Sequence, residues 1–426
     1  MSVIESGRRR RPLPRGSSVA VIGAGIIGTS AAYGLSERGY KVTLYDRAQP
    51  GATGPSRGNA GHVVGSGIFP LAEPGAAWSG LKMLLDPNAP LKIPPAYYAT
   101  IAPWLWRFWQ SSRGEAFERG VAALVELNRG AVEETEALLG RAGIGHMIRR
   151  DPALYLYESE QSYDASTGHW DKRAEAGLRN THLDARDIAE LEPHLAPIFP
   201  RGVLSHEWAI VTDPFEVVTG LFHAGQARGV VHERVSVDAV LPQGDLVTVT
   251  ANGAPRTHDA ALITAGVWSK ALAEALGENL PVEAERGYNL TYPSRQGLIN
   301  RPLVMADRGV VATPLSPGLR LGGWTELGGT ELPPNPGRWK KMREISEAVL
   351  PELEGAPANE WMGHRPSVPD SVPVVSRSGK TPAVFYAVGH GHYGLSQAAK
   401  TARMIGEIIG EAADARYEAH SIGRFS

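Results

Sequence analysis

The sequence predicts an α/β fold in which a discontinuous dinucleotide-binding domain carries an inserted α+β domain. A buried strand pattern at residues 19–22 runs directly into a glycine-rich turn and then a helix pattern, as in Rossmann-type folds. A second apolar strand, residues 42–45, ends in an acid, Asp46. Alternating patterns at residues 282–292 and 319–325, typical of antiparallel strands, then separate this unit from a further buried strand near the C-terminus.

The first turn has the spacing Gly23-x-Gly25-x-x-Gly28, and each glycine has its own physical role. Gly23 allows the tight turn, Gly25 lets the backbone approach a pyrophosphate, and Gly28 lets the helix pack closely on the strand. The helix, expected over residues 26–38, directs its partially positive N-terminus at the diphosphate. Asp46 is expected to accept hydrogen bonds from the adenosine ribose, which favours FAD or NAD over a cofactor with a 2′-phosphate.

The bulk composition limits the partners. The 426 residues contain 43 lysines and arginines against 45 aspartates and glutamates, so no nucleic-acid partner is expected. Cysteine is absent, which excludes disulfides and thiol chemistry and fits a reducing cytoplasm. No apolar run approaches the roughly 18–20 residues of a transmembrane span. Residues 1–16, with a run of arginines, are expected to form a disordered basic arm; peripheral attachment at the inner face of the membrane is the alternative location.

The loop after the second strand carries the first family-specific motif. Ser-x-x-Asn-Ala-Gly-His at residues 56–62 resembles the D-amino-acid dehydrogenase branch of the FAD-dependent amine and amino-acid oxidoreductases. This superfamily (D-amino acid oxidase-like) also holds glycine oxidase and sarcosine oxidase. Two later segments resemble it as well: Ala-Gly-x-Trp-Ser at residues 265–269 and Gly-His-Arg-Pro-Ser-x-Pro-Asp at residues 363–370. The resemblance covers most of the chain.

The resemblance implies a discontinuous, glutathione-reductase-like FAD-binding domain of Rossmann type, with an inserted α+β substrate domain built on a mostly antiparallel sheet. The FAD-binding segments are expected at residues 17–75, 206–275 and 359–420, and the substrate-domain segments at residues 76–205 and 276–358.

Periodicity and helix-stop residues predict several further elements. One long amphipathic helix is expected over residues 114–142, followed by a strand over residues 143–148. Asp213 is expected to cap a helix that has Pro214 at its first position. Residues 230–240 are expected to form a single strand.

A second Gly-x-Gly-x-x-Gly occurs at residues 389–394, between a strand pattern and a helix pattern. It is not predicted to be a second nucleotide site, because too few residues follow the helix to close another strand–helix–strand unit. The helix N-terminus favours an anionic group, and the resemblance implies that this group is the pyrimidine edge of the flavin. His390 and His392 could suggest a metal, but they lack a third ligand and no metal is predicted.

The resemblance also implies that Arg365 binds the substrate carboxylate, since a guanidinium pairs both carboxylate oxygens. A salt bridge at the surface or between domains is the alternative role for Arg365. Tyr288 is expected as a second substrate contact, and His62 and His364 as walls of the pocket. The residues expected to bind the cofactor are Gly23, Gly25, Ile26, Ile27, Gly28, Asp46, Arg47, Ser56, Asn59, Ala60, Gly61, His62, Val235, Ala265, Gly266, Trp268, Arg365, His390, Gly391, His392, Tyr393 and Gly394.

The function implied by the resemblance is FAD-dependent oxidation of a D-amino acid by hydride transfer from the α-carbon to flavin N5. The imino acid formed would hydrolyse to a 2-oxo acid. Oxidation of a secondary amine, such as a proline or hydroxyproline isomer, sarcosine or an opine, is the alternative. A non-catalytic FAD-binding subunit or an NAD-dependent reductase is the alternative from another class. The residue types leave the electron acceptor open between oxygen, a quinone and a partner flavoprotein.

Overall fold

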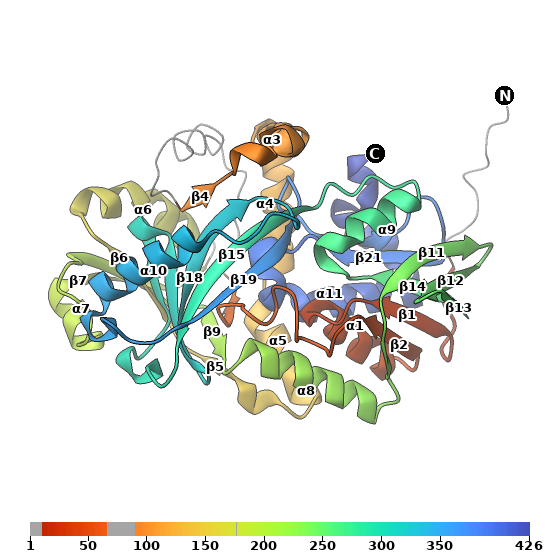
Figure 1. Cartoon of the computed structure of the whole chain (residues 1–426), viewed down its shortest axis with the longest axis horizontal. Helices are drawn as coiled ribbons and strands as arrows, with labels where there is room; N and C mark the ends of the chain where they lie inside the picture. Colours follow the sequence, from red (N-terminus) through yellow and green to blue (C-terminus); the bar gives the residue numbers. More distant parts are fainter. Residues whose placement is uncertain (1–10, 66–89, 176) are drawn as a thin grey trace.

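Strands from three distant stretches of the chain meet in one sheet. The computed structural model describes residues 11–65, 90–175 and 177–426, and among these the strand order is β10-β2-β1-β14-β21-β20 (Figure 1). All neighbours in this order are parallel except β20 and β21. The strands are β1 (Ser18–Ile22), β2 (Lys41–Asp46), β10 (Val231–Arg234), β14 (Ala260–Ile263), β20 (Val374–Arg377) and β21 (Val384–Val388). Parallel pairing brings the carboxyl ends of all these strands except β20 to one edge of the sheet.

Both faces of this sheet are buried, which explains why β1 is an uninterrupted apolar run. Val19 and Val21 face a core shared with two helices, whereas Ala20 and Ile22 face a core shared with an antiparallel meander and a short helix. The two helices are α1 (Ile26–Glu37) and α11 (Gly394–Glu411). The meander is β11 (Val237–Gln243), β12 (Leu246–Ala251) and β13 (Ala254–His258), and the short helix is α9 (Ser269–Ala275).

A second large sheet forms the other lobe of the molecule, at the left of Figure 1. The order of its described strands is β19-β15-β18-β17-β16-β6-β8-β7, with β4 beside β18. Apart from β16–β6 and β18–β4, the described pairs are antiparallel, which confirms the predicted type of sheet. The strands are β4 (Leu91–Lys92), β6 (Ala153–Tyr157), β7 (Asn180–Asp184), β8 (Arg201–Ser205), β15 (Glu283–Tyr292), β16 (Leu303–Met305), β17 (Val310–Leu315), β18 (Gly318–Leu327) and β19 (Asn359–Ser367).

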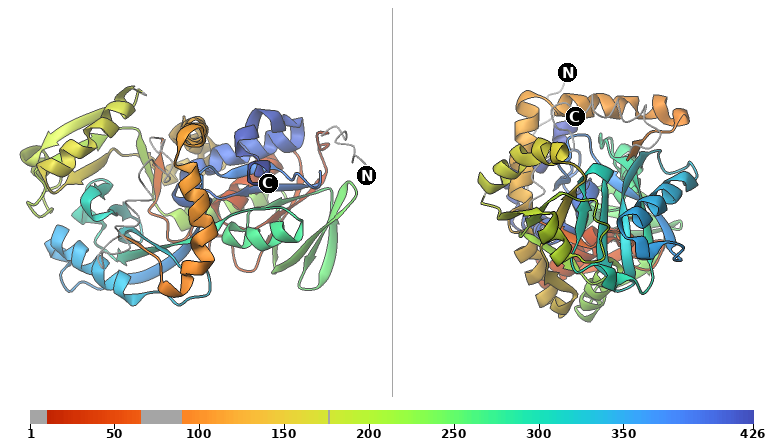
Figure 2. Two further views of the ribbon diagram at one scale, coloured as in Figure 1. Left: turned by 90° about the horizontal axis from the view of Figure 1, so that it is seen from above. Right: turned by 90° about the vertical axis from the view of Figure 1, so that its left-hand side faces the viewer.

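Helix α10 (Pro336–Val349) buries one face of this second sheet, with Met342, Ile345 and Val349 in the shared core. Helices α6 (Glu160–Glu175) and α7 (Ala185–Leu191) belong to the same lobe. Helix α3 (Tyr98–Ser111) lies over the junction of the two lobes (Figure 2). Short 3₁₀ turns occur at Pro95–Tyr97, Gly145–Met147, Gly266–Trp268, Gln296–Leu298, Ala306–Arg308, Pro351–Leu353, Gly391–Tyr393, Ala413–His420 and Ile422–Phe425.

A small antiparallel sheet of β3 (His62–Val64), β9 (Trp208–Val211) and β5 (Ile148–Arg150) connects the lobes. Helix α8 (Pro214–Ala227) follows it. The Asp213 side chain accepts a hydrogen bond from the Phe215 amide at 2.9 Å, so the predicted cap with proline at the first position is confirmed.

Three local predictions were wrong, each because a turn interrupts an apolar pattern. The helix expected over residues 114–142 is two helices, α4 (Gly114–Asn128) and α5 (Ala131–Arg141), because Gly130 takes φ +70 between them. The strand expected over residues 143–148 is instead a 3₁₀ turn that leads into β5. Residues 230–240 divide into β10 and β11, since the chain leaves the parallel sheet between them to start the meander.

Two segments pack differently from the expectation. Helix α5, expected in the substrate domain, packs in one core with α8 and α11 of the nucleotide-binding lobe. Of the expected disordered arm, residues 1–10 lie outside the described residues, but Leu13 is hydrogen-bonded to α11 and to Tyr40, which precedes β2. The Leu13 amide donates to the Ile409 carbonyl at 2.8 Å, and the Tyr40 hydroxyl donates to the Leu13 carbonyl at 3.0 Å. Within residues 11–65, 90–175 and 177–426, no helix is both long and apolar enough to cross a bilayer.

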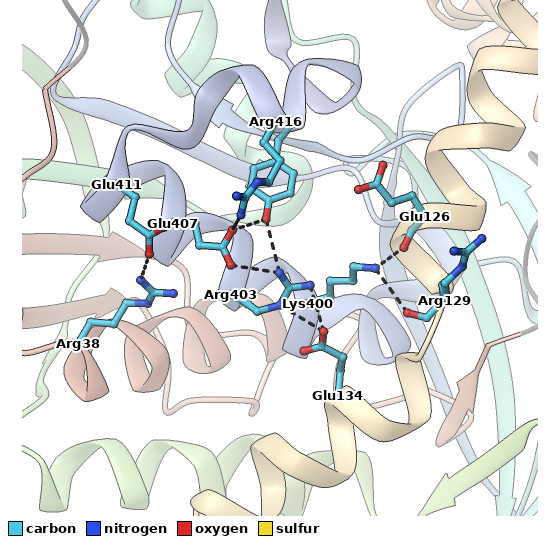
Figure 3. Close-up of polar contacts among 10 residues, drawn as sticks. Arg38, Glu126, Arg129, Glu134, Lys400, Arg403, Glu407, Glu411 and Arg416 are labelled. Atoms are coloured by element: carbon cyan, nitrogen blue, oxygen red, sulfur yellow. Dashed lines mark hydrogen bonds and ion pairs between the residues drawn. The ribbon is translucent and has the colours of Figure 1, made fainter.

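Charged side chains connect the outer side of α11 to α4, α5 and the end of the chain (Figure 3). Arg403 pairs with Glu134 of α5 at 3.0 Å and with Glu407 at 3.1 Å. Lys400 donates to the carbonyl of Arg129, which follows α4, at 3.4 Å. The Arg403 side chain is 38% exposed, so water screens its ion pairs and they contribute little to stability. Apolar burial therefore holds α11 in place.

We expect Ile405→Ala, at a fully buried position of α11, to lower the free energy of unfolding by about 2–5 kcal/mol, because it leaves a cavity in the core. Arg403→Gln should lower it by less than about 1 kcal/mol. Urea unfolding followed by circular dichroism measures both. A larger loss for Arg403→Gln than for Ile405→Ala would show that ion pairs, not apolar contacts, anchor the helix.

Candidate active site

One cavity of about 730 Å³ runs between the two large sheets. Its floor is the carboxyl edge of β1, β2 and β14, and its roof is formed by β15, β18 and β19. Asp46, Arg47 and Val235 lie at one end, and His62 and Trp208 lie at the other. In open parallel sheets, ligands bind at this carboxyl edge.

The floor of the cavity rests on close backbone contacts at Gly23 and Gly28, which leave no room for a Cβ atom at either residue. Gly23 has φ +108, and a Cβ at Gly28 would lie 1.8 Å from the Gly23 carbonyl oxygen. A Cβ at Gly23 would lie 2.6 Å from the Thr264 carbonyl oxygen. These distances agree with the roles expected for Gly23 and Gly28. The Ile26 amide, in the first turn of α1, donates to the Ser56 hydroxyl at 3.0 Å, so the loop after β2 lies against the start of this helix.

Asp46 ends β2 at the floor of the cavity. Its carboxylate accepts hydrogen bonds from the Ala24 amide at 2.7 Å and the Ala48 amide at 2.9 Å. The Arg47 guanidinium lies 4.4 Å from the ring centroid of Trp268, a cation–π contact, and both residues line the cavity. This end therefore combines a fixed carboxylate with a flat, partly exposed aromatic surface; Ala265 and Gly266 line it as well.

The loop at residues 56–62 is tied to the roof. Asn289 of β15 donates to the Gly58 carbonyl at 2.9 Å, and Arg320 of β18 donates to the Asn59 carbonyl at 2.6 Å. The Asn59 side chain accepts from the Gly61 amide at 2.8 Å. Ser56, Asn59, Ala60 and His62 line the cavity, whereas Gly61 lies just behind it with φ +79.

Two glycines leave room for flat side chains on the roof. The Arg365 guanidinium lies across Gly287, where a Cβ would be 2.4 Å from Cζ. The Trp361 indole lies across Gly363, where a Cβ would be 1.9 Å from the ring. Both side chains line the cavity. Trp361 was not predicted as a site residue, although it stands two residues before Gly363 in the motif.

Within the described part of the protein, Arg365 forms hydrogen bonds through only one of its three guanidinium nitrogens, Nη1. Nη1 donates to Glu285 Oε1 at 3.1 Å and to Thr325 Oγ1 at 3.2 Å. In the described part of the chain, Nε and Nη2 make no hydrogen bond. The salt bridge considered as the alternative is thus present, yet Arg365 also lines the cavity, and its Nε and Nη2 atoms make no hydrogen bond with the described residues.

Two residues expected in the substrate site direct their side-chain contacts differently from the prediction. The Tyr288 side chain points to the α10 side of β15. There its hydroxyl donates to Glu326 at 3.1 Å and accepts from the Asn335 amide at 3.0 Å. Tyr288 is among the residues that line the cavity, but both hydrogen-bonding directions of its phenol are used on the α10 side, so its expected contact with substrate stays a prediction. His364 does not line the cavity; its ring packs 6.0 Å from Trp268, which corrects its expected role as a wall.

His62 does form part of the wall. Its Nε2 atom lies 2.6 Å from the Thr313 hydroxyl, and its ring packs edge-on against Trp208 at 5.1 Å. Burial lowers the pKa of His62 to about 3, so the imidazole is neutral at physiological pH. Tyr155 and Trp208, which sequence patterns did not single out, complete this aromatic end of the cavity.

The second glycine motif brings the start of α11 to the cavity, as predicted. His390, Gly391, His392, Tyr393 and Gly394 all line it. Gly391 takes φ +49, whereas Gly394 has φ −54 and is an ordinary helical residue. His390 is buried with Nε2 3.0 Å from the Thr401 hydroxyl, and burial lowers the pKa of His390 to about 3.

The fold and cavity together define a dinucleotide-binding protein of the two-domain flavoprotein type. The family described as "FAD dependent oxidoreductase" matches residues 18–408, and the chain belongs to this family. FAD is therefore its cofactor. The glycine junction fits such a group, since Gly23, Gly25 and Gly28 carry no side chain at the start of α1.

Relatives of known name align over nearly the whole chain. A protein of Bradyrhizobium diazoefficiens named D-amino-acid oxidase is 32% identical over 404 residues, which cover 93% of this chain and 96% of the relative. A protein of Sinorhizobium medicae named D-amino acid dehydrogenase is 28% identical and covers 92% and 96%. The structure of glycine oxidase from Geobacillus kaustophilus shares the fold, with a TM-score of 0.72 and 18% identity over 93% of this chain and 95% of that one.

If Asp46 holds the adenosine ribose, Asp46→Ala should weaken FAD binding by about 1–3 kcal/mol, because polar groups of the cofactor lose their partner. The dissociation constant of FAD, measured by fluorescence titration of the apoprotein, tests this. Asp184→Ala is the matched control, because Asp184 also accepts from two backbone amides but caps α7 away from the cavity. Equal FAD affinity in the Asp46 and Asp184 variants would contradict the assignment.

Proposed function

We propose that this protein oxidises the α-carbon of a D-amino acid, giving an imino acid that hydrolyses to a 2-oxo acid. The observation that carries the proposal is that Arg365 lines the FAD cavity and that its Nε and Nη2 atoms make no hydrogen bond inside the described protein. The names of the two relatives, D-amino-acid oxidase and D-amino acid dehydrogenase, support the same substrate class.

The Nε–Nη2 edge of Arg365 suits the α-carboxylate of an amino acid. A guanidinium presents two parallel N–H groups on one edge, which match the two oxygens of a carboxylate, and it stays charged at any working pH. The side chain is 20% exposed, so water competes only weakly for this pairing. The guanidinium would orient the substrate by its acid group.

The amine would bind uncharged. Among the described residues that line the cavity, the carboxylates are Asp46 and Asp238, both near the Val235 end. The other end has neutral His62, Tyr155 and Trp208, so no anion there would hold an ammonium ion. A neutral amine is the form from which the α-carbon can lose a hydride, and bound FAD supplies the acceptor.

Several residues are proposed to hold the cofactor. Gly25, Ile26 and Ile27 at the start of α1 would bind the diphosphate, and Asp46 the ribose. The loop at residues 390–394 would face the pyrimidine edge of the flavin. Oxygen, a quinone or a partner flavoprotein would take the electrons onward. A cytoplasmic location, with peripheral membrane attachment as the alternative, stays a prediction.

Anaerobic flavin reduction by a substrate panel tests the proposed reaction. The panel holds primary D-amino acids, their L-enantiomers and imino acids such as proline and sarcosine. We expect bleaching of the flavin absorbance by D-amino acids, with little by the L-enantiomers. Faster bleaching by the imino acids would replace the proposed substrate with a secondary amine, and no bleaching by any member would contradict amine oxidation.

Arg365→Lys keeps the charge but loses the paired N–H edge. We expect KM for a D-amino acid to rise about tenfold or more with FAD still bound, since a hydrogen bond to a charged group contributes at least about 1.5 kcal/mol. Steady-state kinetics and the flavin spectrum measure this. Arg343→Lys, a change at a surface arginine of α10, is the control. Unchanged KM in Arg365→Lys would remove this residue from the substrate site.

Gly287→Ala should displace the Arg365 guanidinium without altering its chemistry. The added Cβ would lie 2.4 Å from Cζ, while Gly287 is not among the positive-φ residues, so the backbone accepts alanine. We expect KM to rise about tenfold with FAD retained. Gly297→Ala is the control, because its Cβ would meet nothing within 4 Å. A normal KM for Gly287→Ala would show that the position of the guanidinium is unimportant for binding.

A further inference from the structure

Glu285 is a buried carboxylate directly behind the proposed substrate arginine. It lies on β15 opposite Arg365 on β19, and it is 4% exposed. Oε1 accepts from Arg365 Nη1 at 3.1 Å and from the Thr325 hydroxyl at 2.9 Å, and it pairs with His392 Nε2. Oε2 accepts from the Ser367 hydroxyl at 2.8 Å. Side chains from β18, β19 and the loop before α11 thus converge on one carboxylate.

These contacts keep Glu285 ionised. Burial alone would raise its pKa, but His392, Arg365 and Ser367 outweigh burial and hold the pKa of Glu285 below its usual range. A buried charge is retained only where it is paired and hydrogen-bonded, and here both oxygens are engaged. Glu285 does not line the cavity and has no free oxygen for a substrate proton, so it is not placed to act as a catalytic base.

The contacts determine how the guanidinium of Arg365 is turned. Nη1 is held by Glu285 and Thr325, and the flat group rests on Gly287. With Nη1 held behind, the edge left for a ligand is the one that carries Nε and Nη2. An arginine without this anchor has several rotatable bonds and would present its edge in many directions.

We propose that Glu285 is a positioning residue, which orients Arg365 so that its Nε–Nη2 edge meets the carboxylate of the substrate. This inference rests on the proposed function, because it assigns a partner to the arginine of the same site. Glu285 would raise substrate affinity without touching the substrate.

A double-mutant cycle tests whether Glu285 acts through Arg365. Glu285→Ala, Arg365→Lys and the double variant are compared as FAD-loaded proteins. KM and kcat are measured for the D-amino acid that reduces the flavin fastest, and the dissociation constant of benzoate, a non-reacting carboxylate, from the change in flavin absorbance. Glu283→Ala is the matched control, because Glu283 is also buried and lies on the same face of β15, but it bonds Tyr97.

We expect Glu285→Ala to raise KM and the benzoate dissociation constant about tenfold in the wild-type background, with kcat changed less than threefold. In the Arg365→Lys background the same change should have less than a threefold effect. Glu283→Ala should leave both constants near their wild-type values. Equal effects of Glu285→Ala in both backgrounds would overturn the inference, because they would show that Glu285 acts on the fold and not through Arg365.

If Glu285→Ala does not retain FAD, Thr325→Val replaces it in the cycle, since it removes the hydroxyl that joins Arg365 to Glu285 with little change of shape. The same non-additive pattern is then expected, and additive effects would again overturn the inference. Failure of the proposed function has a different signature: Arg365→Lys alone would leave KM and benzoate binding unchanged.

Discussion

The backbone contact between α1 and the turn after β1 is the constraint on which the rest of the site depends. A Cβ on Gly28 would fall 1.8 Å from the Gly23 carbonyl, so only glycine allows helix and strand to approach this closely. The Thr264 hydroxyl donates to the carbonyls of Ile22 and Gly23, both at 2.9 Å, which adds the end of β14 to the junction. Because three chain segments meet closely here, a helix N-terminus, an acid and a turn share one edge of the sheet.

The roof of the cavity depends on the alternation of side chains along β15. Alternation along β15 sends Tyr288 and Leu290 to the core under α10 and sends Glu285, Gly287 and Asn289 toward the cavity side. Glycine in a strand usually weakens packing, but here it creates the flat surface on which Arg365 lies. The hydrogen bonds from Asn289 and Arg320 then tie the roof to the loop that follows β2.

Charge is distributed unevenly around the cavity. Carboxylates among its described lining residues lie near the Val235 end, whereas Arg365 and Arg320 project from the roof. Burial lowers the pKa of Arg320, whose Nε donates to Thr291 and whose Nη1 donates to the carbonyls of Arg57 and Asn59. Arg365 differs, because its Nη1 is paired with a buried carboxylate, Glu285.

The sequence by itself determined the nucleotide-binding unit, because its glycines, strands and acid follow from local backbone geometry over a few dozen residues. It also determined the capped helix at Asp213, the predominantly antiparallel second sheet and the loops that line the cavity. The tertiary structure decided the face of β15 on which Tyr288 lies, the place of α5 against α11, and the partner of Arg365. Residues 285 and 365 are far apart in the chain, and only the register of β15 on β19 brings them together. Such a pairing leaves no local pattern, because it depends on how distant strands align.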